Sequence, residues 1–373
     1  MNAKPISCGL AAAAMIVLTM STKAQPSIEC KDWGNAAGQP VMLYTLKTAK
    51  GLVMKVTNYG AIITELHAPD RDGKLADIVL GHDSLDGYLA GHPFFGTIAG
   101  RCANRIANGR FELDDKTYQM ATNNGPNHLH GGIKGFDKQV WTARTEVTKA
   151  GPAIHLGLFS PDGQETYPGN LIANATYLLA ENSELHVEMT AMVDRPTLCN
   201  LAQHTYWNLA GHNSGSITNH EVKLFASRYT PVDATLIPTG ELAPVKNTPF
   251  DFTIKKTIGR DLKGTGGDPV GYDHNFVVDG EPFTMKQVAW ARDPKSGRTL
   301  ELWSNQPGVQ FYTGNFLNGT NKGKGGFIYQ KHAGFCLETQ VYPDSIHRPE
   351  WPTPILRPGQ LYRHRMRVKF GAK

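Results

Sequence analysis

The chain has 373 residues, of which 40% are hydrophobic and 19% charged, a balance typical of a globular protein and not of a disordered one. This length allows one large domain or two of ordinary size. The formal net charge of +5 is too small to predict attraction to polyanions, so we expect no nucleic-acid partner. The 39 glycines and 23 prolines punctuate short apolar runs throughout, which favours an all-β protein with many turns.

The first 24 residues have the pattern of a removable signal peptide. Lys4 gives a positive start, residues 9–20 form an apolar core, and residues 22–24 form a small-x-small cleavage site. The apolar core is shorter than the roughly 20 residues that a membrane-spanning helix needs. We therefore expect residues 25–373 to be exported, to the periplasm or the cell exterior, with no membrane attachment once the signal is removed.

Alternating apolar and polar residues predict strands along most of the chain, and only residues 84–90 predict a turn or two of helix. The C-terminal residues 363–370 alternate basic and apolar side chains, which indicates a strand with a charged outer face that discourages pairing at a sheet edge. No change in composition and no repeat marks a second domain, so we expect one antiparallel β-sandwich or barrel-like domain over residues 25–373. The other predicted strands are residues 41–69 with a break at 58–60, 78–81, 111–113, 117–120, 173–180, 184–194, 200–208, 227–230, 275–278, 300–304 and 309–315.

The predicted strand 200–208 carries polar side chains where a core strand would carry apolar ones. Residues two apart share a face, so Asn200, His204, Tyr206 and Asn208 are expected on one side of the sheet. A face with amide, imidazole and phenol groups is either a hydrogen-bonded polar patch or a functional site. We take His204 as the centre of a site.

Four further polar segments interrupt the apolar pattern, at residues 100–106, 127–132, 271–276 and 334–340. Each has a simpler alternative. Arg105 by itself is more simply a structural ion-pair partner, and histidines in a glycine-flanked loop, such as His128 and His130, are often surface or capping residues. Glu338 is harder to dismiss, because an unpaired carboxylate in an apolar strand is costly.

His128, His130, His204 and Glu338 together would make a conceivable metal-ligand set. Metal-binding jelly rolls usually place a glutamate a few residues after a His-x-His pair, however, and residues 131–137 contain none. Phosphate-loop, dinucleotide-binding, zinc-protease and serine-hydrolase motifs are absent from the sequence. The chemistry that remains is acid–base catalysis by one imidazole and one carboxylate, with no metal or cofactor.

Four cysteines follow the signal segment: Cys30, Cys102, Cys199 and Cys336. An even number in an exported chain allows disulfides, although a protein of this size folds without them. Their spacings match no zinc pattern. The pairing of the cysteines is left open by the sequence.

At its polar segments the chain resembles the aldose 1-epimerase, or galactose mutarotase, family. The similarity covers about residues 30–373, and several motifs in the right order are far more specific than any one of them. The matching segments are Gly100-Arg-Cys-Ala-Asn-Arg-Ile-Ala107, Leu129-His-Gly-Gly-Ile-Lys-Gly-Phe-Asp137, His204-Thr-Tyr-Trp-Asn-Leu209, Asp273-His-Asn-Phe276, Gln306-Pro-Gly-Val-Gln-Phe-Tyr-Thr-Gly-Asn315 and Gly334-Phe-Cys-Leu-Glu-Thr-Gln340.

The resemblance implies the large β-sandwich of the galactose mutarotases, often called a supersandwich, and interconversion of the α and β anomers of free hexoses such as galactose and glucose. It implies that Glu338 is the base at the anomeric hydroxyl and that His204 is the acid at the ring oxygen, the two meeting on opposite sides of one pyranose. The residues that the resemblance assigns to sugar binding are Asn104, Arg105, His130, Asp273 and Gln310.

The expected partner is a free aldohexose, bound by a monomer or a homodimer. Trp207 stands where many family members have phenylalanine, which is expected to change packing beneath the cleft and not the proton transfers. His128 has no role in the resemblance, and we expect it to support the site indirectly. The alternatives are a non-catalytic sugar-binding protein on the same scaffold, or an epimerase acting on modified sugars.

Overall fold

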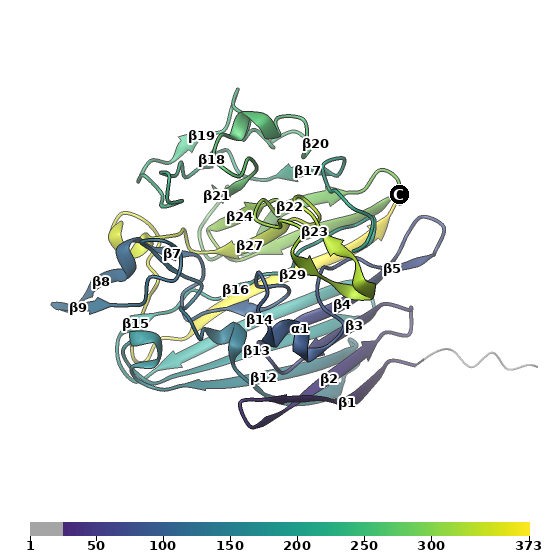
Figure 1. The fold of residues 1–373 in the computed structure, drawn as a ribbon, viewed down its shortest axis with the longest axis horizontal. Helices are drawn as coiled ribbons and strands as arrows, with labels where there is room; N and C mark the ends of the chain where they lie inside the picture. The colour runs from purple at the N-terminus through teal and green to yellow at the C-terminus, as the bar shows by residue number, and fades with distance from the viewer. Residues whose placement is uncertain (1–24) are drawn as a thin grey trace, which may run out of the picture.

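The computed structural model describes residues 25–373 and shows an almost all-β protein, as expected (Figure 1). The predicted signal peptide, residues 1–24, lies outside the described residues. A nine-stranded antiparallel sheet forms one layer, and two five-stranded sheets form the other. The inner faces of all three sheets share one hydrophobic core, in which Met54, Val187 and Phe311 are all buried. This arrangement is a β-sandwich.

The nine-stranded sheet runs through both halves of the chain. Its strand order is β11 (Thr142–Val147), β12 (Pro152–Ser160), β13 (Leu171–Ala180), β14 (Glu184–Val193), β29 (Tyr362–Ala372), β23 (Arg298–Ser304), β22 (Lys286–Arg292), β17 (Glu221–Leu224) and β20 (Lys256–Thr257). The predicted hairpin of residues 173–180 and 184–194 is confirmed as β13 and β14.

The C-terminal strand β29 lies in the middle of this sheet, between β14 and β23. Its Met366, Val368 and Phe370 are buried, while Arg363 and Arg365 face outward, so the predicted alternation is confirmed. The suggestion that its charges protect a sheet edge is wrong. Its neighbours instead carry acidic side chains on the outer face, and Glu188 of β14 pairs with Arg363.

The second layer is formed by the two five-stranded sheets. The N-terminal one contains β1 (Ser27–Ala36), β2 (Gln39–Lys47), β3 (Val53–Thr57), β4 (Ile63–Pro69) and β5 (Leu75–Asp77) in sequence order. The other has the order β19 (Ala243–Pro244), β18 (Arg228–Tyr229), β21 (Asp273–Val277), β24 (Gly308–Tyr312) and β27 (Cys336–Gln340). The predicted helix is present as α1 (Leu85–Leu89).

The remaining strands of the described residues form short two-stranded pairs. They are β6 (Ile98–Ala99) with β16 (Ala202–Gln203), β7 (Arg105–Ile106) with β10 (His128–Leu129), β8 (Arg110–Leu113) with β9 (Lys116–Gln119), β15 (Thr197–Leu198) with β28 (Ile355–Leu356), and β25 (Asn321–Lys322) with β26 (Ile328–Tyr329). Within residues 25–373 no helix has the length and apolar character needed to cross a membrane.

Two predicted strands are wrong because their backbone groups bond to partners other than a neighbouring strand. In residues 78–81 only Val79 forms a bridge, and its carbonyl oxygen accepts a hydrogen bond from the buried Nζ of Lys324. In residues 200–208 only β16 is a strand. The peptide groups of His204 bond to Thr97 and Gly96, and those of Trp207 bond to Phe335, so the segment threads between several loops.

Candidate active site

Three neighbouring strands, β21, β24 and β27, form the floor of the site. Their register pairs Gln310 with Glu338 and Tyr312 with Cys336, so these four side chains lie on one face of the sheet with Asp273. The residues between them face the core. Both faces of these three strands are buried, one against the core and the other beneath the site. Their sequences therefore show no clear alternation of apolar and polar residues.

Loops from the N-terminal half form one wall of the site. Paired strands β7 and β10 hold Asn104 against His130: the backbone N–H of Asn104 donates to His130 Nδ1 at 3.2 Å, and the N–H of His130 donates to the Asn104 carbonyl at 3.0 Å. Both residues have a positive φ, of 61° and 49°. A backbone in this region is uncommon for residues with a side chain, and the reciprocal bonds fix it.

Arg101 anchors this wall, although its importance is not evident from the sequence. Its guanidinium is buried and donates hydrogen bonds to Ser160 and to the carbonyl oxygens of Pro161, Pro168 and Gly169. Burial lowers its pKa to about 10, which still leaves it charged at neutral pH. The loop that carries Asn104 and Arg105 is thereby tied to the nine-stranded sheet.

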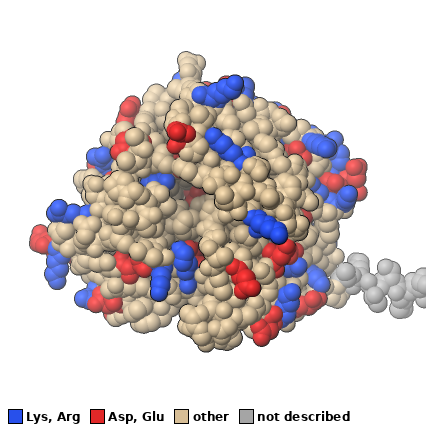
Figure 2. Space-filling model, viewed as in Figure 1, with Lys and Arg blue, Asp and Glu red and all other residues tan. Residues whose placement is uncertain are grey.

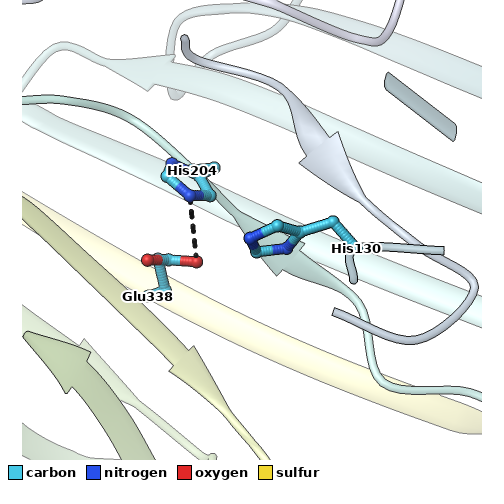
Figure 3. A group of neighbouring side chains, drawn as sticks. All are labelled: His130, His204 and Glu338. Carbon is cyan, nitrogen blue, oxygen red and sulfur yellow. Dashed lines mark ion pairs between the residues drawn. The ribbon is translucent and has the colours of Figure 1, made fainter. Parts of the chain in front are cut away.

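His204 and Glu338, far apart in the sequence, are neighbours in the structure. His204 Nε2 lies 3.4 Å from Glu338 Oε2, and His130 lies beside them with its ring at 70° to that of His204 (Figure 3). The rings of Tyr206 and Phe94 lie nearly parallel to the imidazole, with centroids 5.2 and 5.8 Å away. These contacts restrict the imidazole to one orientation.

Burial disfavours the charged form of both groups. It lowers the pKa of His204 to about 4. Burial, and then repulsion from the Asp273 carboxylate, holds the pKa of Glu338 well above its usual value, against a smaller opposing effect of Arg105. Glu338 Oε2 is buried without a hydrogen-bond partner among the described residues. A carboxyl oxygen of this kind is suited to receive a ligand hydroxyl.

Arg105, Asp273 and Gln310 form a second polar group on the same floor. Gln310 Nε2 donates to one oxygen of Asp273 at 2.7 Å, and the guanidinium of Arg105 lies 3.9 Å from the other. Arg105 also donates to Asn124 at 2.9 Å. The group places the guanidinium of Arg105, a hydrogen-bond donor, beside the carboxylate of Asp273, an acceptor. This combination can bind neighbouring hydroxyls.

These side chains surround a cavity of about 270 Å³, large enough for a monosaccharide. A wider hollow of about 630 Å³ shares Arg105, Asn124, Asp273 and Phe316 with it, and a depression is visible on the face of the molecule in Figure 2. Acidic and basic side chains are interspersed over the same face. The cavity is lined by Pro93, Phe94, Asn104, Arg105, Asn124, Leu129, His130, His204, Tyr206, Asp273, Tyr312, Phe316 and Glu338.

Six of the seven site residues predicted from the sequence line this cavity. The seventh, Gln310, does not line it but donates a hydrogen bond to Asp273. Phe94 and Phe316, which also line it, were missed, because isolated phenylalanines in loops carry no sequence signal. Asn200 and Asn208, predicted on the same face as His204, instead bond to backbone groups of other segments.

His128 points away from the cavity. Its Nδ1 lies 2.8 Å from the Ala121 carbonyl oxygen and so carries the proton, and Nε2 then accepts from the Tyr167 hydroxyl at 2.9 Å. It fixes the strand that precedes His130. Trp207 is buried in the core against Phe370.

His130, His204 and Glu338 offer ligand atoms within 4.8 Å of one another, which raises the question of a metal. His130 does not fit that role. Its Nδ1 accepts the Asn104 N–H, so Nε2 of the neutral ring carries a proton and has no lone pair for a metal ion. His128, which also belongs to the metal-ligand set considered from the sequence, is not free to bind a metal because both of its ring nitrogens are hydrogen-bonded. The trio is better suited to hydrogen bonding and proton transfer.

All four cysteines of the described residues are free. Cys30 is exposed, while Cys102, Cys199 and Cys336 are buried. Of these, Cys336 is the one that reaches the site, because its Sγ lies 3.6 Å from Nδ1 of His204.

The fold and the site together define the class of the protein: a large antiparallel β-sandwich with a buried imidazole–carboxyl pair in a cavity the size of a monosaccharide. Comparisons place the chain more narrowly. Residues 42–369 match the family model for aldose 1-epimerase. The chain therefore belongs to the aldose 1-epimerase family.

Individual relatives agree with this assignment. The chain is 47% identical over 319 residues to galactose mutarotase from Homo sapiens, covering 86% of this chain and 91% of that protein. It is 36% identical over 342 residues to aldose 1-epimerase from Escherichia coli, covering 90% and 97%. The crystal structure of galactose 1-epimerase from Lactobacillus acidophilus superposes with a TM-score of 0.82 at 27% identity, covering 93% of this chain and 99% of that one.

Proposed function

We propose that the protein is an isomerase, an aldose 1-epimerase that interconverts the α and β anomers of free hexoses such as galactose and glucose. The names of its relatives, galactose mutarotase and aldose 1-epimerase, support this activity. The observation that carries it is the 3.4 Å contact between His204 and Glu338 within a sugar-sized cavity. Anomer interconversion needs one proton removed and one delivered, with no redox step.

In the proposed reaction Glu338 takes the proton of the anomeric hydroxyl while His204 Nε2 delivers a proton to the ring oxygen. The bond between the anomeric carbon and the ring oxygen breaks, and the anomeric carbon becomes an aldehyde. Rotation about the bond to the next carbon presents the other face of the aldehyde. Closure then reverses both proton transfers and yields the other anomer.

The spacing of the two groups suits this chemistry. The anomeric hydroxyl and the ring oxygen are bonded to the same carbon, so their acid and base must be close neighbours. The adjacent positions of His204 and Glu338 meet that requirement, and they support a sugar that both groups approach from one side, in place of the opposite sides expected from the sequence. Each well-placed acid or base contributes roughly 10²–10⁴ in rate.

The pair carries a single exchangeable proton throughout the cycle. In the resting site, burial favours the neutral arrangement in which Glu338 holds this proton. Moving it across the 3.4 Å contact gives the carboxylate and imidazolium that start the reaction. Proton transfer through the sugar returns the pair to the neutral arrangement, so no net proton enters or leaves.

We assign Arg105, Asp273 and His130 to sugar binding, and Gln310 and Asn104 to their support. Arg105 and Asp273 are placed to hold neighbouring hydroxyls, with Gln310 orienting Asp273. Nε2–H of His130 donates toward the cavity, because its Nδ1 is already an acceptor. Asn104 holds His130 through the backbone.

The test is polarimetric mutarotation of galactose and glucose by the wild type, His204→Ala and Glu338→Gln. We expect each substitution to lower kcat/KM by at least about a hundredfold, with folding checked by circular dichroism. Wild-type rates in both folded variants would contradict the assignment. A wild-type protein that binds sugar but does not accelerate mutarotation would be a sugar-binding protein instead.

We also propose that residues 1–24 direct export and are removed. Support comes from the charged start, the apolar core and the cleavage pattern of this segment. N-terminal sequencing of protein recovered from the periplasm or medium is expected to begin at Gln25. Recovery of full-length protein from the cytoplasm alone would contradict export.

A further inference from the structure

Cys336 and Glu338 lie two residues apart on β27, so both side chains project from the same face of this strand. That face meets the imidazole of His204. Sγ of Cys336 lies 3.6 Å from Nδ1, and Oε2 of Glu338 lies 3.4 Å from Nε2. One strand therefore places a side chain close to each ring nitrogen, and the backbone of His204 itself is a further hydrogen-bond partner for the ring.

The two partners differ in chemistry. Cys336 is fully buried, and burial, with a further contribution from Glu338, holds the pKa of its thiol well above the usual value, so the sulfur is uncharged. A thiol sulfur is a weak hydrogen-bond acceptor. Where a carboxylate faces Nδ1, as in serine-protease triads, it orients the ring and makes the imidazole more basic. A neutral sulfur also orients the ring, but it increases the basicity of the imidazole only slightly.

The other groups around His204 do not supply a charge at Nδ1 either. His130 and His92 are neutral, since burial holds the pKa of His130 well below its usual value and lowers that of His92 to about 3. Phe94 and Tyr206 stack on the ring. The charged residues Arg105 and Asp273 lie near each other and act on the pKa of Glu338, not on that of His204.

We propose that Cys336 is a positioning residue for the anomer interconversion. Its sulfur accepts the Nδ1–H of His204, so the proton on Nδ1 stays in place while the proton on Nε2 is exchanged with the sugar. The imidazolium thus remains a strong acid, which suits a proton donor to a weakly basic ring oxygen. This inference rests on the proposed function.

NMR of the wild-type protein can detect which ring nitrogen of His204 carries the proton. With ¹⁵N-labelled histidine and His204→Gln for assignment, neutral His204 is expected to carry its proton on Nδ1 and none on Nε2. The opposite tautomer would overturn the proposal. This measurement needs no variant of Cys336 and no turnover.

The variants test the effect of the sulfur. A serine hydroxyl is a better acceptor than sulfur, so Cys336→Ser is expected to raise the titration midpoint of His204 by at least about half a pH unit and to lower kcat about three- to tenfold. Cys336→Ala removes the acceptor and is expected to lower kcat without raising the midpoint. Cys199→Ser, an equally buried cysteine away from the cavity, is the matched control and should change neither.

The outcomes separate the two hypotheses. A wild type without mutarotase activity would overturn the proposed function. An active wild type with an unchanged His204 midpoint in folded Cys336→Ser would overturn the role of Cys336 alone, whether or not kcat falls, because a stronger acceptor at Nδ1 must change the acidity of the ring.

Discussion

At the scale of the residue, the pH dependence of the site follows from two buried groups that hold one proton between them. Adding a second proton requires a buried imidazolium next to a neutral carboxyl, and removing the last one requires a buried carboxylate next to a neutral imidazole. Burial opposes both steps. The pair is therefore expected to titrate as a unit, first at low pH and again well above the usual range of a glutamate.

Mutarotation should accordingly follow a broad bell-shaped pH profile, and Asp273→Asn should move its alkaline limb. The Asp273 carboxylate raises the pKa of Glu338, and Arg105 lowers it. Removing the carboxylate leaves Arg105 unopposed, so the last proton of the pair is lost at lower pH. We expect the alkaline midpoint of kcat/KM to fall by at least about half a unit.

Asp279→Asn, at an exposed carboxylate outside the cavity, is the control for this experiment. Its alkaline midpoint should match that of the wild type. An Asp273→Asn enzyme whose alkaline limb stays in place, or moves to higher pH, would show that Asp273 does not act on Glu338.

Among the elements of the fold, strands β21, β24 and β27 of the C-terminal five-stranded sheet are buried on both faces, one against the core and the other beneath the site. In β27, Leu337 and Thr339 face inward, while Cys336 and Glu338 face the site. The sequence marks Glu338 as unusual, because a carboxylate in a buried strand is costly unless it has a purpose. It gives no sign that Cys336 differs from an ordinary buried cysteine.

The segment that carries His204 shows the limit of reasoning from alternation. Period-2 spacing predicts a strand over residues 200–208, but only Ala202–Gln203 pairs as one. His204 and Tyr206 do lie at the cavity, and Asn200 and Asn208 do not. The local pattern identifies polar residues that need partners, and the surrounding loops determine which partners they find.

At the scale of the whole molecule, the nine-stranded sheet joins the two halves of the second layer. Strands β14 and β29 are neighbours in its centre, and the hydrophobic core runs without interruption from Met54 of the N-terminal sheet to Phe311 of the C-terminal one. Removing either five-stranded sheet would expose apolar surface of the shared layer. Neither half is expected to be stable alone.

Residues 25–373 should therefore unfold in a single cooperative transition. In differential scanning calorimetry of the mature protein, the calorimetric and van't Hoff enthalpies are expected to agree. Two resolved transitions, or a proteolytic fragment that retains one five-stranded sheet in folded form, would show instead that the chain contains two domains.

The all-β class, most strand positions and the motifs that mark His204, Glu338 and the residues we assign to sugar binding follow from the sequence alone. These properties are local, because alternation and turn residues act over a few neighbours. The three-dimensional arrangement was needed to show that His204 lies between Glu338 and Cys336, that Arg101 anchors the wall of the site, and that β29 is a central strand. Those contacts join distant segments, and they are set by how the sheets pack and not by any short stretch of chain.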